Sequence, residues 1–196
     1  MKPSVFILFT MGVLLSFLGG CTAHAPKDNL PPSYHFRDTT KFGVVVYSQV
    51  SDHSTNRVFI EEEASVKDQL NYSEFIYHPL YTPMINKEEY QGALHFLALP
   101  EGDYVMNRWH VQTGGKLLVQ TGWTATFHVE PKKIIYLGRL NIKEDGQQTW
   151  MDVEDQLGED GVMFQKAVPK LAELPINKEL VPSVAKVLTS LEAETK

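Results

Sequence analysis

The chain has 196 residues, with 18 Lys and Arg residues against 24 Asp and Glu residues and a formal net charge of −6. This acidic balance, with no basic tract beyond Lys132-Lys133, excludes a surface for nucleic acid and therefore excludes nucleic acid as a partner. With 43% hydrophobic and 21% charged residues, the composition predicts one globular domain of ordinary size and excludes the disordered class.

The first 20 residues have the organisation of a secretory signal peptide. A lysine at position 2 supplies the positive charge, Val5–Leu18 is an apolar stretch, and two glycines precede Cys21. The apolar stretch has fourteen residues, fewer than the roughly 20 that a membrane-spanning helix needs. We therefore expect residues 1–20 to be removed, and we do not expect them to remain as a transmembrane anchor.

Leu18-Gly19-Gly20-Cys21 resembles the lipobox of bacterial lipoproteins. The resemblance implies that signal peptidase recognises Leu18, Gly19 and Gly20, and that the Cys21 thiol takes up diacylglycerol and becomes the mature first residue. The alternative is an ordinary signal peptide that is cleaved elsewhere. Cys21 is the only cysteine, so an exported chain has no partner for a disulfide, which favours acylation.

The residue after the cysteine bears on localisation. In lipoproteins of bacteria with two membranes, an aspartate there marks retention in the inner membrane, and this chain has Thr22. The resemblance therefore implies a lipid-anchored protein of the cell envelope, in the outer membrane and facing the periplasm. The implied covalent lipid on Cys21 is the only non-protein group that the sequence predicts, and no other cofactor is expected.

Residues 21–40 are polar and broken by Pro26, Pro31 and Pro32, which is typical of a flexible tether. A tether of about 19 flexible residues has a root-mean-square reach of roughly 25 Å, so the domain should stay near its membrane. Residues 41–155 follow as the main domain.

Short segments rich in β-branched and aromatic residues, separated by turn residues, fill the main domain and predict strands. The expected strands are 42–47, 57–61, 73–77, 92–99, 104–112, 116–120, 123–129, 134–142 and 148–153. Residues 80–90 are predicted to form a loop. Pro100 and Gly102 suit a tight turn, and Gly114-Gly115 suits a hairpin turn.

This succession of strands without intervening helices predicts a mainly β fold, an antiparallel two-layer sandwich of prealbumin-like or Ig-like type. The segments Leu99-Pro100-Glu101-Gly102-Asp103-Tyr104, Phe127-His128-Val129-Glu130-Pro131 and Ile135-Tyr136-Leu137-Gly138 resemble small bacterial lipoproteins with a carboxypeptidase-regulatory-like, or prealbumin-like, β-sandwich domain. The resemblance covers roughly residues 41–142 and implies a domain that binds or braces. The chain departs from the family at Lys132, where the family usually has glycine.

Residues 156–196 are predicted to form a helical extension that packs on the sandwich. One helix should begin with Asp160 as its N-cap and end before Pro169. A second helix is expected from about Pro182, because Val184, Val187, Leu188 and Leu191 repeat at helical spacing. Its apolar face could instead form a groove for a partner.

Residues that could support chemistry are few. The seven histidines show no metal-ligand spacing. His110 and His128 could approach one another across a sheet, but solvated histidines are the expectation, so no metal site is predicted. The acidic residues between Asp152 and Asp160 are expected to form a solvated linker, and Glu61-Glu62-Glu63 an exposed strand end. No nucleophile motif is present, so we predict no catalytic residues and no enzyme activity.

Aromatic residues suggest the remaining candidate site. Trp109 and Trp123 lie on apolar strand faces and are expected in the core, whereas Trp150 and Tyr136 could bind a glycan. The sequence therefore predicts a membrane-anchored envelope lipoprotein that acts as a non-catalytic accessory or scaffold, with another envelope protein as its partner. The alternative is a ligand-binding module that recognises a glycan or peptidoglycan fragment through Trp150 and Tyr136.

Overall fold

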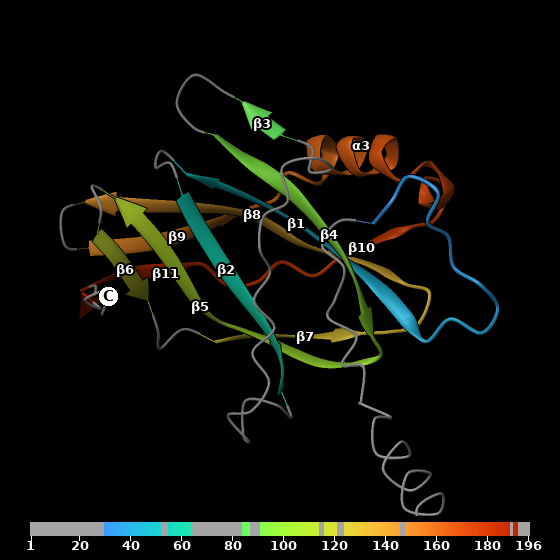
Figure 1. The fold of residues 1–196 in the computed structure, drawn as a ribbon, viewed down its shortest axis with the longest axis horizontal. Helices are drawn as coiled ribbons and strands as arrows, with labels where there is room; N and C mark the ends of the chain where they lie inside the picture. The colour runs from blue at the N-terminus through green and yellow to red at the C-terminus, as the bar shows by residue number, and fades with distance from the viewer. Residues whose placement is uncertain are drawn as a thin grey trace, which may run out of the picture.

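The structure is a computed structural model, which describes residues 30–51, 55–63, 84–86, 91–113, 116–120, 124–145, 148–188 and 190–191. In these ranges the chain is mainly β, consistent with a β-sandwich, and carries one α-helix, α3 (Leu157–Ala167), followed by the short 3-10 helix η2 (Pro169–Leu171) (Figure 1). The predicted mainly β class is therefore confirmed. The predicted strand 73–77 lies outside the described residues, as does most of the predicted loop 80–90.

One sheet, here called sheet A, has seven strands in the order β11-β9-β8-β1-β4-β3, with β10 also paired to β8. Its strands are β1 (Phe42–Ser51), β3 (Met84–Asn86), β4 (Gln91–Pro100), β8 (Ile134–Asp145), β9 (Gln148–Glu154), β10 (Ile176–Lys178) and β11 (Val184–Leu188). β1 and β10 both run parallel to β8. The sheet is thus mixed and differs from the antiparallel arrangement that was predicted.

The other sheet, sheet B, has five strands in the order β12-β6-β5-β2, with β7 also paired to β5. Its strands are β2 (Thr55–Glu62), β5 (Gly102–Thr113), β6 (Lys116–Gln120), β7 (Ala125–Val129) and β12 (Ser190–Leu191). Thr113 of β5 pairs with Lys116 of β6, as the predicted hairpin requires. The β4–β5 turn passes from sheet A to sheet B, because these two strands belong to different sheets.

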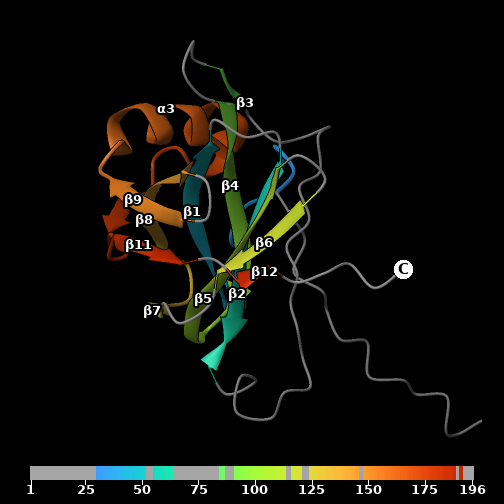
Figure 2. The same ribbon diagram turned by 90° about the vertical axis from the view of Figure 1, so that its left-hand side faces the viewer.

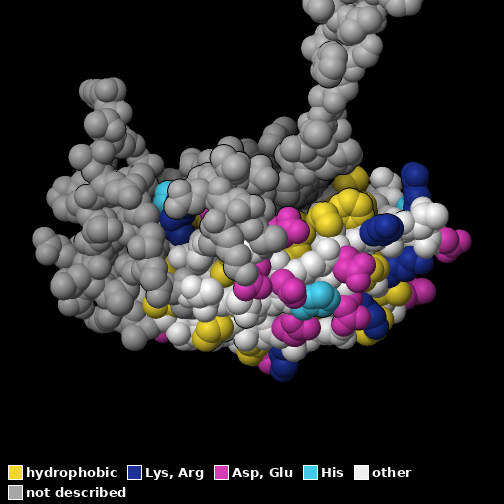
Figure 3. Space-filling view, turned by 90° about the horizontal axis from the view of Figure 1, so that it is seen from below, with side chains coloured by type: hydrophobic (Ala, Val, Ile, Leu, Met, Phe, Trp, Pro, Cys, Tyr) yellow, Lys and Arg dark blue, Asp and Glu magenta, His cyan; other side chains and the backbone are white. Residues whose placement is uncertain are grey.

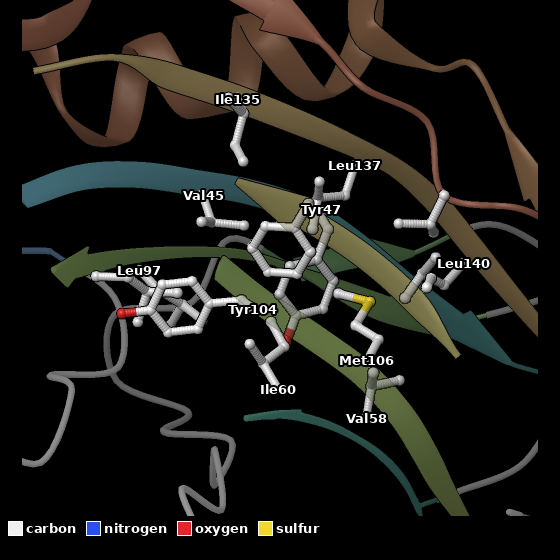
Figure 4. Close-up of a cluster of buried hydrophobic side chains, with 14 of the residues drawn as sticks. Val45, Tyr47, Val58, Ile60, Leu97, Tyr104, Met106, Ile135, Leu137 and Leu140 are labelled. Atoms are coloured by element: carbon white, nitrogen blue, oxygen red, sulfur yellow. The ribbon is translucent and has the colours of Figure 1, made fainter. Parts of the chain in front are cut away.

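The main core lies between the two sheets, where apolar side chains from both converge (Figure 4). Val45, Leu97 and Leu140 enter it from sheet A, and Val58 and Met106 enter it from sheet B. The alternation expected for β7 is confirmed, since its residues are buried and exposed in turn. Trp109 is fully buried in this core, as predicted, and Trp123 lies outside the described residues.

The opposite face of sheet A carries a second core beneath α3. Val46 of β1, Phe96 of β4 and Tyr136 of β8 pack there with Phe164 of α3 and with Leu171 of η2. Phe96 and Phe164 meet edge to face at 5.7 Å between ring centroids. The helix therefore covers the side of sheet A that faces away from sheet B, as Figure 2 shows from the side, so this first part of the predicted helical extension does pack on a sheet.

The segment 30–40 belongs to the folded domain and is not part of a tether. Leu30 is 3% exposed and lies in the core beneath α3, and Tyr34 and Phe36 pack against the same core. The predicted tether boundary at residue 40 is therefore wrong. The prolines at 31 and 32 suggested a linker, but the apolar residues around them are buried.

The alternation along β5 changes phase at a bulge. Ile60 of β2 pairs with Met106, whereas Phe59 pairs with Arg108, so Asn107 is an extra residue. Tyr104 and Met106, before the bulge, and Trp109, after it, consequently all face the core. An extra residue of this kind moves every later side chain to the other face of the strand.

The C-terminal part differs most from prediction. Asp160 is not an N-cap, because α3 begins at Leu157 and Asp160 is buried in its first turns. Residues 184–188 form the strand β11, not a helix. A bulge in β11 lets Val184 pair with Met151 and Val187 pair with Thr149, so a spacing of three residues matches a spacing of two on β9. That bulge is the physical reason why the sequence imitates a helical repeat.

The turn between β7 and β8 has a residue in the left-handed region. Lys132 has φ +61° and follows Pro131, and the Lys133 amide donates to the Glu130 carbonyl at 3.3 Å. Proline at the second position and a positive φ at the third are the features of a type II turn. Lys132 thus adopts a conformation that glycine adopts at lower cost.

Candidate functional site

The predicted lipidation site cannot be placed by the structure. Leu18, Gly19, Gly20 and Cys21 lie outside the described residues, and their role remains a prediction. Within the described ranges, no helix combines the length and apolar character needed to cross a bilayer.

Tyr136 is not available for ligand binding, which corrects the prediction of an aromatic glycan platform that includes it. The ring is 0% exposed in the core beneath α3. Its hydroxyl donates to the Asp160 carboxylate at 2.6 Å. Burial, followed by this hydrogen bond and the charge of Asp160, raises the pKa of Tyr136 far above its ordinary value. The phenol is therefore a fixed hydrogen-bond donor within the domain.

A buried polar cluster surrounds Asp160, and we call it the Asp160 cluster; its other members are Ser48, Tyr136, Arg139 and Glu159. The Asp160 carboxylate accepts from the Ser48 hydroxyl at 2.5 Å, from Tyr136 and from the Arg139 guanidinium. Arg139 also donates through Nε to Ser48 Oγ at 3.2 Å and through Nη1 to Glu159 at 3.1 Å. The cluster joins α3 to β1 and β8.

A bulge in β8 positions Arg139 for this cluster. Val46 pairs with Tyr136 and Ser48 pairs with Arg139, so two residues of β8 lie opposite Tyr47. One of them is Gly138, whose φ is +110°. Without the extra residue, Arg139 would point to the opposite face from Tyr136, into the core between the sheets. The bulge therefore directs the guanidinium toward α3 and Asp160.

The two buried charges of the cluster, Arg139 and Asp160, compensate one another. Arg139 is 1% exposed and Asp160 is 0% exposed. Burial alone would lower the pKa of Arg139, but the hydrogen bonds and charges of Asp160 and Glu159 outweigh it and raise that pKa. Through these hydrogen bonds the cluster joins α3 to sheet A.

Sequence reasoning missed this cluster and treated residues 152–160 as one solvated acidic linker. The structure separates these acidic residues. Asp155 accepts from Lys178 at 2.5 Å and Asp152 accepts from Lys143 at 2.7 Å, both on the surface, whereas Asp160 is buried. The available signal was Gly138-Arg139 within an otherwise apolar strand, because a glycine inside a strand often marks a bulge.

Trp150 lies on the outer face of sheet A, beyond the Asp160 cluster. It pairs with Lys143 across β8 and β9, and Asp152 follows two residues later on the same face. Its ring is partly buried. The ring thus lies beside the exposed Lys143–Asp152 ion pair. Of the two aromatic residues predicted to bind a glycan, Trp150 is the one that is not fully buried. We call Lys143, Trp150 and Asp152 the Trp150 face.

The histidines that the structure describes do not converge. His128 pairs with Asp103 across β5 and β7, with its Nδ1 atom 2.6 Å from the carboxylate. His110 lies seven residues further along β5 and packs against Phe59. His95 stacks on Tyr47 at 4.9 Å between ring centroids, and burial lowers its pKa to about 4. Among the described residues, no three His, Cys, Asp or Glu side chains come together as metal ligands would.

The outer face of sheet B carries an ion pair that corrects the predicted exposure of Glu61, whereas Glu62 and Glu63 are exposed as predicted. Glu61 is 6% exposed, and its carboxylate accepts from Asn107 at 2.9 Å and from Arg108 at 3.5 Å. The Arg108 guanidinium also lies 4.2 Å from the centroid of the Phe59 ring. These contacts order the surface of the strand pair β2–β5.

No protein-family model, curated protein or solved structure matches this chain. The described residues form a mainly β domain with a helix on the outer face of one sheet.

Proposed function

We propose that this chain is a lipid-anchored protein of the bacterial cell envelope that acts as a non-catalytic accessory or scaffold. The observation that carries the proposal is Leu18-Gly19-Gly20-Cys21, directly after a short apolar stretch and with the only cysteine of the chain. The mature protein begins at Cys21, carries diacylglycerol on its thiol and is held in the outer membrane, facing the periplasm.

The finer fold assignment is part of the same proposal. The domain is a prealbumin-like sandwich related to the small bacterial lipoproteins named above. The described architecture supports this proposal with its two sheets around a common core. The mixed pairing of sheet A and the covering helix are additions to that plan.

The geometry of the Asp160 cluster supports a bracing role over catalysis. A scaffold needs a surface whose shape does not change when a partner binds, and buried, mutually bound charges hold α3 in one position. The partner is another envelope protein. Crosslinking in intact cells, followed by capture of the lipidated protein and mass spectrometry, should recover one defined envelope protein. Recovery of none would contradict the accessory role.

The anchor is tested separately with a fatty-acid analogue. Cys21→Ser should abolish labelling and leave either an uncleaved precursor or a soluble product. Gly20→Ala is the matched control, because it keeps a small residue before the cysteine and should be labelled and cleaved normally. Membrane-bound labelling of Cys21→Ser at the original level would contradict the proposal.

One specific observation favours the second candidate function, a module that binds a glycan or peptidoglycan fragment. Trp150 lies beside the exposed Lys143–Asp152 pair on one face, and aromatic rings next to polar groups suit sugar rings. Titration with soluble peptidoglycan fragments would test it. Binding should be lost in Trp150→Ala and kept in Val162→Ala, an exposed residue on α3.

A further inference from the structure

Asn141, in the middle of β8, carries a nearly buried amide without a hydrogen-bond partner. The residue is 8% exposed, and its side chain makes no hydrogen bond to the part of the chain that the structure describes. Neither of its amide atoms is fully enclosed, so a ligand can reach them from the surface. Because withdrawn polar groups of folded proteins are normally paired, this amide indicates a partner from outside the chain.

Asn141 lies on the same side of sheet A as the Trp150 face. Lys143 follows it by two residues along β8, and Asp152 pairs with it across β8 and β9. Trp150 is its diagonal neighbour on β9, at the separation of about 7–8 Å that aromatic side chains bridge. We call Asn141 together with the Trp150 face the Asn141 site.

The neighbouring strand and helix limit the Asn141 site on two sides. Val50 of β1 pairs with Asn141 across the other edge of β8 and is 1% exposed. Arg139 precedes Asn141 by two residues, and its guanidinium already binds the carboxylates of α3. The helix lies away from the end of β8 and the start of β9 (Figure 1). Among the described elements, the open side of Asn141 is therefore the one toward the Trp150 face.

The charges of the Asn141 site balance one another. Lys143 Nζ lies 2.7 Å from Asp152 Oδ2, and both side chains are almost half exposed. Glu154, two residues beyond Asp152 on the same side of β9, is exposed and acidic, so these residues supply no excess of positive charge for a phosphate or a carboxylate. The described part of the face away from α3, shown in Figure 3, instead carries many charged side chains of both signs. A neutral ligand therefore fits the Asn141 site best.

We propose that the Asn141 site binds a neutral N-acetylated amino sugar of a glycan, and that Asn141 selects the acetamido group. This inference rests on the second candidate function, the binding of a glycan or a peptidoglycan fragment. An amide side chain holds an acceptor and a donor in one plane, and the N–H and carbonyl of an acetamido group offer the complementary pair. A sugar with a hydroxyl in place of the acetamido group leaves one of these amide atoms unpaired, which lowers its affinity.

The other residues of the site bind the remainder of the sugar. The Trp150 indole packs on the apolar face of the pyranose ring. The Asp152 carboxylate accepts hydrogen bonds from sugar hydroxyls, and the Lys143 ammonium donates hydrogen bonds to them. Trp150 therefore supplies affinity for sugars in general, whereas Asn141 discriminates between them.

Chitotriose and cellotriose test this selectivity, because both are neutral trisaccharides and they differ in the acetamido groups. The full-length protein is titrated in a detergent without a sugar headgroup, which would compete for the site. The indole N–H signal of Trp150, assigned by its loss in Trp150→Phe, is followed by NMR. Chitotriose should bind more tightly than cellotriose by about tenfold.

Two matched variants assign the preference to one amide. Asn141→Leu should bring the affinities for the two trisaccharides within about twofold of each other. Asn177→Leu makes the same change on an exposed residue of β10 and should keep the preference. Without any sugar, Asn141→Leu should leave the midpoint of urea unfolding unchanged or raise it, because an apolar side chain of similar shape replaces an unpaired amide. A lower midpoint would reveal a structural partner and overturn the inference.

The remaining outcomes separate this inference from the function on which it rests. Equal affinities in the unsubstituted protein, a failure of chitotriose to bind, or a preference that survives in Asn141→Leu would overturn the inference. Soluble peptidoglycan fragments that still shift the Trp150 signal in those cases leave the second candidate function in place. A Trp150 signal that neither the trisaccharides nor the fragments shift refutes that function, and the inference with it.

Discussion

The guanidinium of Arg139 donates to the carboxylate of Asp160 inside the domain, and this pair holds α3 on sheet A. Both side chains are almost completely buried. The pair depends on a bulge at Gly138, because only that extra residue directs Arg139 toward the helix.

Asp160→Asn should lower the free energy of unfolding by about 3–5 kcal/mol, because it leaves the Arg139 charge buried without its main counterion. Glu159→Gln is the matched control. Glu159 also accepts from Arg139, but its side chain is 39% exposed, so the loss should stay below about 1 kcal/mol. Urea unfolding followed by circular dichroism measures both. Equal, small losses in the two variants would show that the buried pair is not what holds α3.

Gly138→Ala should destabilise the domain by about 1–3 kcal/mol. Its φ of +110° is strained for any residue with a Cβ atom, and a Cβ there would lie 2.6 Å from Val153 Cγ1. Gly158→Ala is the control, since a Cβ at that helical position meets no atom within 4 Å and should stabilise α3 by about 0.5–1 kcal/mol. Thermal unfolding should separate the two in sign, and a neutral Gly138→Ala would contradict the bulge geometry.

Lys132→Gly should stabilise the domain by about 0.5–1 kcal/mol, because glycine adopts the φ of +61° without a steric penalty. Lys133→Gly removes the same charge from the same turn without relieving a positive φ, so it should be neutral or destabilising. The midpoints of urea unfolding for the two variants provide the comparison. A loss of stability in Lys132→Gly would mean that the turn does not hold position 132 in the left-handed region.

His95 should make stability depend on pH. Burial lowers its pKa from 6.5 to about 4, so between these values the unfolded chain binds a proton that the folded chain does not. The stabilisation is fully present above pH 6.5 and is lost as the pH falls toward 4, by about 2–3 kcal/mol. Unfolding in urea at pH 7, 5.5 and 4.5 measures it. His95→Gln should flatten this dependence, and an unchanged pH profile in that variant would assign the effect to other groups.

Local patterns predicted much of the fold. Strands β1, β4, β5, β6, β7, β8 and β9 follow from the alternation and turn residues of their own segments. The C-terminal segment failed because a bulge in β11 imitates a helical repeat. The parallel pairing of β1 with β8 joins segments about ninety residues apart, and no local pattern encodes which distant strand lies beside which.

The candidate site was less predictable than the fold. Tyr136 and Trp150 were both chosen as aromatic residues on strands, but their exposure depends on what packs above each strand. Tyr136 lies beneath α3 and Trp150 lies beyond it. Asp160 was predicted to be an N-cap because it directly precedes the segment 161–168. Its partner, Arg139, is 21 residues earlier in the chain, so no local pattern joins the two. Sequence alone could identify the charged residue in β8 but not the carboxylate that it binds.

The measurement that tests the central proposal most directly is the mass of the mature N-terminal peptide of the protein extracted from its native membrane. The account predicts a peptide that begins at Cys21 and carries a diacylglyceryl group on the cysteine sulfur. A peptide that begins elsewhere, or an unmodified Cys21 thiol, would contradict it.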